Sequence, residues 1–173
     1  MKKLELSNLK LKTFTEQDAI DYCHLNNINP KNIILLNLIN NQLTDISGIR
    51  LFKNLKELNI SNNEITDISV LKNLNKLEYL DLWANEIEDI SVLKNLTDLN
   101  ILIISYNKVS DISVLKYLKN LIILGINDLK LESDQIQYIQ YIKSLKNFKT
   151  LFGYKGFKDM SVLKQLNKNI KTY

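Results

Sequence analysis

One segment of the chain recurs every 22 residues, and this period constrains the fold more than any other feature of the sequence. Its three clearest copies begin at Leu55, Leu77 and Leu99. The segment from Ile33 fits the same pattern, and the segment from Leu121 fits it only at first. A fixed period of this length is typical of a solenoid, in which each repeat is one supersecondary unit stacked on the next. The sequence therefore predicts a solenoid of stacked coils.

Each repeat opens with a short segment that has the period of a β-strand. Counted from the first apolar residue, positions 1, 4 and 6 are apolar in every copy, as in Leu55, Leu58 and Ile60. Positions 4 and 6 have a period of two, so they face one side of a strand while positions 3, 5 and 7 face the other. We expect these strands to pair in parallel, with positions 4 and 6 in the core.

An asparagine recurs at position 9, always between two apolar positions. A polar side chain inside an apolar frame must have its amide hydrogen-bonded, and stacked asparagines can bond the backbone of the bend after each strand. We interpret these residues as a structural asparagine ladder, made of Asn41, Asn63, Asn85 and Asn107.

The second half of each repeat begins with Asp-Ile-Ser, as at Asp67–Ser69. We expect the serine to be the N-cap of one short helical turn, with the apolar residues at positions 14, 17 and 20 facing inward. Each repeat is then a strand, an asparagine bend and a capped short turn.

The pattern L-x-x-L-x-L-x-x-N-x-I-x-D-I-S-x-L-x-x-L resembles the leucine-rich repeats of the 22-residue, internalin-like type, from Ile33 to about Leu131. It departs from that family at position 16, where Gly48 and three valines stand in place of a frequent proline. The resemblance implies an α/β fold, a curved solenoid with a parallel β-sheet on the concave face and short 3₁₀ or helical turns on the convex face. It also implies a non-enzymatic module that binds a protein partner on the concave face.

Three regions are expected along the chain. Residues 1–32 form an N-terminal cap with a helix over about 15–27, and residues 133–173 form a C-terminal cap with a helix and a divergent last repeat. The repeats lie between these caps, at residues 33–54, 55–76, 77–98, 99–120 and a degenerate 121–132.

The N-terminal cap has its own local signals. Leu4–Leu11 alternates as a small hairpin or one irregular strand would, and Thr15 reads as the N-cap of the helix. Ile20, Cys23 and Asn27 are expected to share the inner face of this helix. Cys23, the single cysteine, is best explained as a small buried apolar group.

The C-terminal cap begins where the repeat decays. A helix is predicted over Asp134–Lys146, with Ile136, Ile139, Ile142 and Leu145 as its core face. A strand-like segment, Phe148–Tyr154, follows it. The segment Phe157–Leu166 then restores positions 11 to 20 of the repeat.

The sequence argues against an enzyme, a cofactor or a metal site. It contains no glycine-rich phosphate loop, no paired histidines and no Ser-His-Asp set. The repeated aspartates offer one carboxylate per coil, too few for the six to eight oxygens that Ca²⁺ requires. No apolar run is long enough to span a membrane, and no signal peptide is evident, so we expect a cytoplasmic chain. A secreted or surface-exposed protein whose leader had been removed would look the same.

The outward strand positions carry the candidate binding site. Trp83, the single tryptophan, and Tyr79 are four residues apart and face outward on the same side of one strand. Isoleucines on the following strands continue the apolar surface. Large exposed apolar patches usually mark interaction sites, and Trp and Tyr are preferred anchors of binding hot spots. The predicted partner-binding residues are Glu57, Tyr79, Asp81, Trp83, Ile101, Ile103, Tyr106 and Ile123.

Three alternatives remain open at this stage. The C-terminal cap would cover the outward isoleucines if it folded back over them, or self-association into a homo-oligomer would bury them. The less favoured alternative is nucleic acid, which the basic segment from Lys143 onward would contact through its lysines and aromatic residues.

Overall fold

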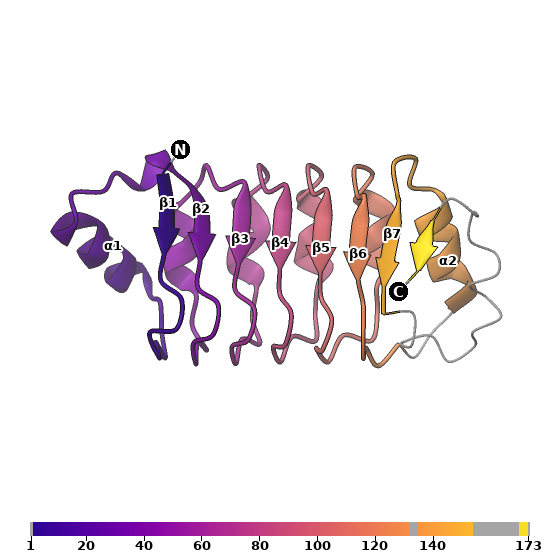
Figure 1. The fold of residues 1–173 in the computed structure, drawn as a ribbon, viewed down its shortest axis with the longest axis horizontal. Helices are drawn as coiled ribbons and strands as arrows, with labels where there is room; N and C mark the ends of the chain where they lie inside the picture. Colours follow the sequence, from indigo (N-terminus) through magenta and orange to yellow (C-terminus); the bar gives the residue numbers. More distant parts are fainter. Residues whose placement is uncertain (1, 132–134, 154–169, 173) are drawn as a thin grey trace.

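The computed structural model describes residues 2–131, 135–153 and 170–172, and of residues 135 and 136 only the backbone. The strands among them pair in parallel, in the order of the chain, and form one sheet along the whole solenoid (Figure 1). The strands are β1 (Lys2–Glu5), β2 (Ile33–Asn37), β3 (Glu57–Asn59), β4 (Tyr79–Asp81), β5 (Ile101–Ile103), β6 (Ile123–Gly125), β7 (Thr150–Phe152) and β8 (Lys171–Thr172).

The strand register places equal repeat positions side by side. Leu58 pairs with Leu80, and Leu80 with Leu102, while Glu57 pairs with Tyr79 on the other face. The leucines of position 4 are fully buried, as the alternation of the sequence predicts. The curved solenoid with a parallel sheet is therefore confirmed, and the outward positions 3, 5 and 7 lie on its concave face.

Short 3₁₀ turns form the side of each coil opposite the sheet. The apolar residues at positions 14, 17 and 20 are buried in every complete coil, as in Ile68, Leu71 and Leu74. These turns bring each coil back to the next strand and close the core from behind. They are η2 (Ser47–Leu51), η3 (Ser69–Asn73), η4 (Ser91–Asn95) and η5 (Ser113–Tyr117), while a further short turn, η1 (Pro30–Asn32), leads directly into β2.

The prediction that serine caps these turns is wrong. Ser69 is the first residue of η3, and the aspartate two residues earlier does the capping: Asp67 Oδ1 accepts from the Ser69 backbone N–H at 2.7 Å. Asp67 Oδ2 also accepts from the Ser69 hydroxyl at 3.1 Å. A carboxylate oxygen reaches the amide two residues on, as in an Asx-turn, which leaves the serine inside the turn.

The position-9 asparagines lie at the bends and tie each coil to the preceding one. Asn85 Nδ2 donates to the backbone oxygens of Ile60 in the preceding coil and Leu82 in its own, at 3.0 and 3.1 Å. Asn85 Oδ1 accepts from the Ile65 backbone N–H at 3.1 Å. Asn107 makes the same three contacts one coil later. Each buried amide is therefore hydrogen-bonded by the backbone of two coils.

The N-terminal segment is a coil of the solenoid, so the hairpin alternative is wrong. β1 pairs in parallel with β2, which places Leu4 beside Leu36. Asn41 Oδ1 accepts from the Leu9 and Leu11 backbone N–H groups at 3.0 Å, as the ladder asparagines do in later coils. The edge of β2 is thereby covered by a strand of the chain itself.

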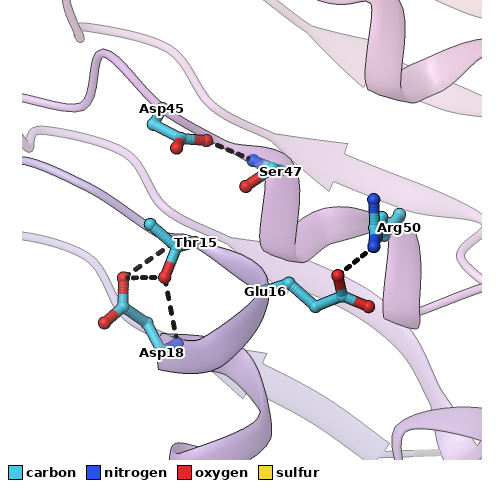
Figure 2. A network of polar contacts seen from close by, with 6 residues as sticks. All are labelled: Thr15, Glu16, Asp18, Asp45, Ser47 and Arg50. Atoms are coloured by element: carbon cyan, nitrogen blue, oxygen red, sulfur yellow. Dashed lines mark hydrogen bonds and ion pairs between the residues drawn. The ribbon is translucent and has the colours of Figure 1, made fainter.

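Helix α1 (Glu16–Leu25) closes this end. Thr15 is its N-cap, as predicted: the Thr15 hydroxyl accepts from the Asp18 backbone N–H, and Asp18 accepts from the Thr15 backbone N–H at 2.7 Å (Figure 2). Glu16 forms an ion pair with Arg50 of η2. This reciprocal capping and the ion pair hold the start of α1 against the first repeat.

The inner face of α1 differs from the prediction. Cys23 is buried as expected, but Ile20 and Asn27 are exposed and Ala19 takes the second buried position. Ala19 and Cys23 are four residues apart and share a face, whereas Ile20 lies about 100° away from Ala19 around the helix. A small residue suits this position because the helix lies close to η2.

Gly48 permits this close approach. A Cβ built at Gly48 would lie 2.4 Å from the backbone oxygen of Thr15 and 2.8 Å from that of Phe14. The Gly48 backbone N–H donates to the Phe14 oxygen at 2.8 Å. The other repeats carry valine at this position, so glycine marks the one coil on which α1 packs.

At the other end, helix α2 (Gln135–Lys143) packs against η5 and β7 continues the sheet. Ile139, Ile142 and Leu145 are buried as predicted. Tyr138 is buried too, and its hydroxyl lies 3.1 Å from Asp111 Oδ1. The side chain of Ile136 and the predicted repeat segment Phe157–Leu166 lie outside the described residues.

Candidate functional site

The concave face carries an apolar patch, which we define as Trp83, Ile101, Ile103, Tyr106 and Ile123. The isoleucines lie on β5 and β6 and are half-buried, while Trp83 and Tyr106 follow β4 and β5 and are 40% and 48% exposed. The register pairs Tyr79 with Ile101 and Ile101 with Ile123. The predicted apolar residues therefore lie next to one another across three strands.

The backbone places Tyr106 in an unusual conformation. Position 8 has a positive φ in each coil from β1 to β6, and Asn8, Asn40 and Asn62 occupy it at the N-terminal end. Asparagine tolerates this left-handed conformation better than other residues with a side chain. These asparagines also form an exposed row, since Asn62 Nδ2 donates to Asn40 Oδ1 at 2.7 Å.

The exposed row ends at the apolar patch. Ala84 and Tyr106 occupy position 8 in the next two coils, with φ of 52° and 57°. The Tyr106 ring meets the Trp83 ring edge to face, with centroids 5.7 Å apart. An aromatic residue in a left-handed conformation is strained, and such strain clusters at binding sites. The loss of asparagine at position 8 is therefore a sequence signal for this site, and the apolar repeat pattern alone does not show it.

Asp81 lies between Tyr79 and Trp83 and accepts hydrogen bonds with both oxygens. Asp81 Oδ1 accepts from the Trp83 backbone N–H at 2.9 Å, and Oδ2 accepts from the Tyr79 hydroxyl at 3.2 Å. Burial raises the pKa of the Asp81 carboxyl, and these two hydrogen bonds only partly oppose the rise. Burial and the nearby Asp81 charge raise the pKa of Tyr79 to about 12. The Asp81 charge is thus held in a partly desolvated place.

The concave face is acidic between β2 and β6. Glu57 and Asp81 are the charged residues at outward positions 3, 5 and 7 of these described coils. Neither takes part in an ion pair among the described residues. Glu78 also stands near the patch in the sequence, but Lys56 neutralises it at 2.6 Å.

A hollow adjoins Tyr79 on the same face. It has a volume of about 210 Å³ and extends from β1 to β4. Lys3 lies at its far end, where its ammonium group is paired with Glu5 at 2.8 Å. The hollow is lined by Lys3, Leu35, Leu36, Asn37, Glu57, Asn59 and Tyr79.

The described part of the C-terminal cap does not cover the apolar patch. β7 pairs with β6 at the side of the sheet, and α2 packs against η5 on the opposite side of the solenoid (Figure 1). β7 adds Phe152, which is 38% exposed and pairs with Gly125. The 22-residue count missed Phe152 because α2 lengthens this coil, although Leu151 could have been aligned with Leu124.

Other kinds of site find little support among the residues that the structure describes. No three His, Cys, Asp or Glu side chains gather there as the ligands of a metal ion would. None of the described helices is long and apolar enough to cross a membrane.

Comparison with known proteins agrees with the repeat pattern. The model of the family "Leucine Rich repeats (2 copies)" matches residues 31–73, 53–95 and 75–117, which together make up half of the chain. No curated protein sequence matches significantly.

Two solved structures have a similar fold. Internalin C2 from Listeria monocytogenes aligns with a TM-score of 0.75 and 27% identity, over 98% of this chain and 78% of that one. A leucine-rich-repeat protein from Leptospira interrogans aligns with a TM-score of 0.74 and 25% identity, over 100% of this chain and 42% of that one. The chain belongs to the leucine-rich-repeat proteins, of the internalin-like type.

Proposed function

We propose that the chain is a non-enzymatic module that captures a partner protein on its concave face, centred on the apolar patch. Leucine-rich-repeat proteins are modules for protein–protein interaction, which supports the general class. The exposure of Trp83 and Tyr106 in contact with each other is the observation that carries this proposal. A paired Trp and Tyr at the centre of a half-buried apolar surface has the composition of a binding hot spot.

The partner is expected to present apolar side chains with basic groups beside them. Glu57 and Asp81, which form no ion pair among the described residues, lie on the N-terminal side of the apolar patch. A basic partner surface would be complementary to them and would be steered toward this face. An acidic partner, or the phosphates of a nucleic acid, would be repelled here.

Truncation of the tryptophan tests the proposal. We expect Trp83→Ala to weaken partner binding by roughly 2–4 kcal/mol, as truncation of hot-spot residues does. The fold should be little affected because the side chain points away from the core. Quantitative mass spectrometry identifies the partner as a protein that wild type captures and Trp83→Ala does not. Direct titration of that purified protein then measures its affinity for both chains.

Two tyrosines provide a matched control. Tyr106 and Tyr117 are both 48% exposed, but Tyr106 belongs to the apolar patch and Tyr117 to η5 on the convex side. Asparagine replaces both without departing from the repeat, since Asn62 and Asn95 stand at the equivalent positions. Tyr106→Asn should lose the partner and Tyr117→Asn should keep it. If both variants bind alike, the concave proposal is wrong.

Self-association is the alternative occupant of this surface. Sedimentation of the wild-type chain and of Trp83→Ala over a range of concentrations separates the two cases. If wild type is a dimer and Trp83→Ala is a monomer, the apolar patch binds a second copy of the chain and not a partner protein. A monomer whose Trp83 emission is blue-shifted and shielded from quencher would show that the chain covers its own patch.

A further inference from the structure

Asp81 carries a charge that its structural task does not require. In the coils of β2, β3 and β4, the side chain at position 5 accepts a hydrogen bond from the backbone N–H two residues on, and Asn59 does this for Ser61 at 2.9 Å. Asn37 does it for Ile39 at 3.1 Å. Asp81 does the same for Trp83 at 2.9 Å. An amide oxygen therefore suffices for the bend, and the carboxylate of Asp81 adds a negative charge and a second acceptor oxygen, which the Tyr79 hydroxyl uses.

That charge lies in unfavourable surroundings. Asp81 is half-buried, receives one backbone and one phenol hydrogen bond, and is paired with no cation among the described residues. Burying a charge without a counter-ion is destabilising, whereas an amide at this place would avoid the penalty. Groups that reduce stability are retained where function needs them, since binding sites and stability often conflict.

The neighbours of Asp81 form a site of definite shape. The register pairs Glu57 with Tyr79 and Asn59 with Asp81, so two carboxylates and a phenol occupy adjacent places on β3 and β4. The hollow of about 210 Å³ adjoins Glu57, Asn59 and Tyr79. Lys3, at the far end of the hollow, is engaged by Glu5. On the other side of Asp81 stands the exposed ring of Trp83.

We propose that Glu57, Tyr79 and Asp81 form a cation site, which receives an arginine or lysine side chain of the partner protein while the adjoining apolar patch holds its apolar neighbours. The inference rests on the proposed function and names the chemistry that the partner must present. A cationic group beside Asp81 supplies the missing counter-charge, and its alkyl stem lies along the rings of Tyr79 and Trp83. Arginine suits the site especially, because its planar group stacks on rings and binds carboxylates with two hydrogen bonds.

The test uses two short peptides that differ only in charge. Acetyl-Leu-Arg-Leu-amide carries the cation, and acetyl-Leu-citrulline-Leu-amide is its neutral isostere. Each is titrated to 10 mM into the isotopically labelled full chain, at low salt, while the amide signals of β3 and β4 and the indole signal of Trp83 are followed by NMR. We expect the arginine peptide to bind about 5- to 30-fold more tightly than the citrulline peptide. This ratio should fall as salt is added.

Asp81→Asn isolates the charge. The variant keeps the oxygen that bonds the Trp83 backbone N–H, so it should fold as the coils with Asn37 and Asn59 do. The arginine and citrulline peptides should bind Asp81→Asn with equal affinity, close to the affinity of the citrulline peptide for wild type. Glu57→Gln should reduce the ratio by a smaller factor, because Glu57 is more exposed.

The outcomes separate this inference from the proposed function. Equal binding of both peptides to wild type, with shifts at Trp83, would overturn the cation site and leave the apolar patch as a binding surface. Absence of any shift up to 10 mM would also overturn the cation site, while the Tyr106 and Tyr117 variants still decide the partner proposal. An undiminished ratio in folded Asp81→Asn would show that Asp81 is not the group that binds the cation.

Discussion

The ring of Tyr106 meets the ring of Trp83 edge to face, with their planes inclined by 71°. The two residues come from successive coils, Trp83 from position 7 and Tyr106 from position 8. Both lie beyond the last of the asparagines that occupy position 8 in the N-terminal coils. The pair forms because Tyr106 accepts a positive φ, which aims its side chain at the neighbouring coil. The apolar patch thus depends on a local departure from the repeat.

Tyr106→Asn should change the free energy of unfolding by less than about 1 kcal/mol. Relief of the left-handed strain, about 1–2 kcal/mol, opposes the loss of the aromatic contact, about 0.5–1.5 kcal/mol. Trp83 should meanwhile become more accessible to solvent, with red-shifted emission and faster quenching by acrylamide. Tyr117→Asn should leave the emission unchanged. Unaltered quenching of Trp83 in Tyr106→Asn would contradict the ring contact.

Asn85→Ala should destabilise the solenoid by about 1–3 kcal/mol, because backbone groups of two coils lose their buried partner. The exposed Asn95 of η4 is the control, and Asn95→Ala should stay within about 0.5 kcal/mol. Denaturant unfolding measures both. Folded Asn85→Ala should still bind the partner. A strong loss of binding with unaltered unfolding would assign Asn85 to the binding site instead.

Asp81→Asn should make the chain more stable at neutral pH. Burial raises the folded-state pKa of the Asp81 carboxyl above its ordinary value of 3.8, so the folded chain holds this proton more tightly than the unfolded chain. Stability contributed by Asp81 therefore falls as the pH rises through the window from 3.8 to the raised pKa. Denaturant unfolding of both proteins from pH 3 to pH 7 should show curves that separate as the pH rises. A variant less stable than wild type at pH 7 would contradict the cause that we assign.

Gly48→Ala should loosen the N-terminal cap. The added methyl group meets the backbone oxygens of Thr15 and Phe14, and overpacking of this kind costs about 1–3 kcal/mol. Hydrogen exchange should become faster in α1 while the central strands change little. Val92→Ala, at the same position of a central repeat, is the control and should leave α1 protected. Equal protection of α1 in all three proteins would mean that the helix does not pack as closely as the structure has it.

The repeat period determined most of the fold. A recurrent pair of leucines at strand spacing leaves one arrangement in which every coil buries its apolar side, and the parallel sheet, the inward residues and the outward rows follow from it. Thr15 was likewise readable as a cap, because a capping box lies within four consecutive residues. The concave position of Tyr79, Asp81 and Trp83 needed only the alternation of a strand.

Contacts between residues far apart in the sequence account for the features that the repeat pattern did not predict. The coil formed by residues 2–14 became visible through its pairing with β2, since Leu9 stands where the ladder has asparagine. Phe152 joined the concave face because α2 changes the length of its coil and the hydrogen bonds of β6 set a new register. Lys56 neutralises Glu78 across adjacent coils, while Asp81 receives no cation among the described residues. Spacing along the chain determines which face a side chain takes, but its partners across the coils depend on the packing of neighbours that the period does not encode.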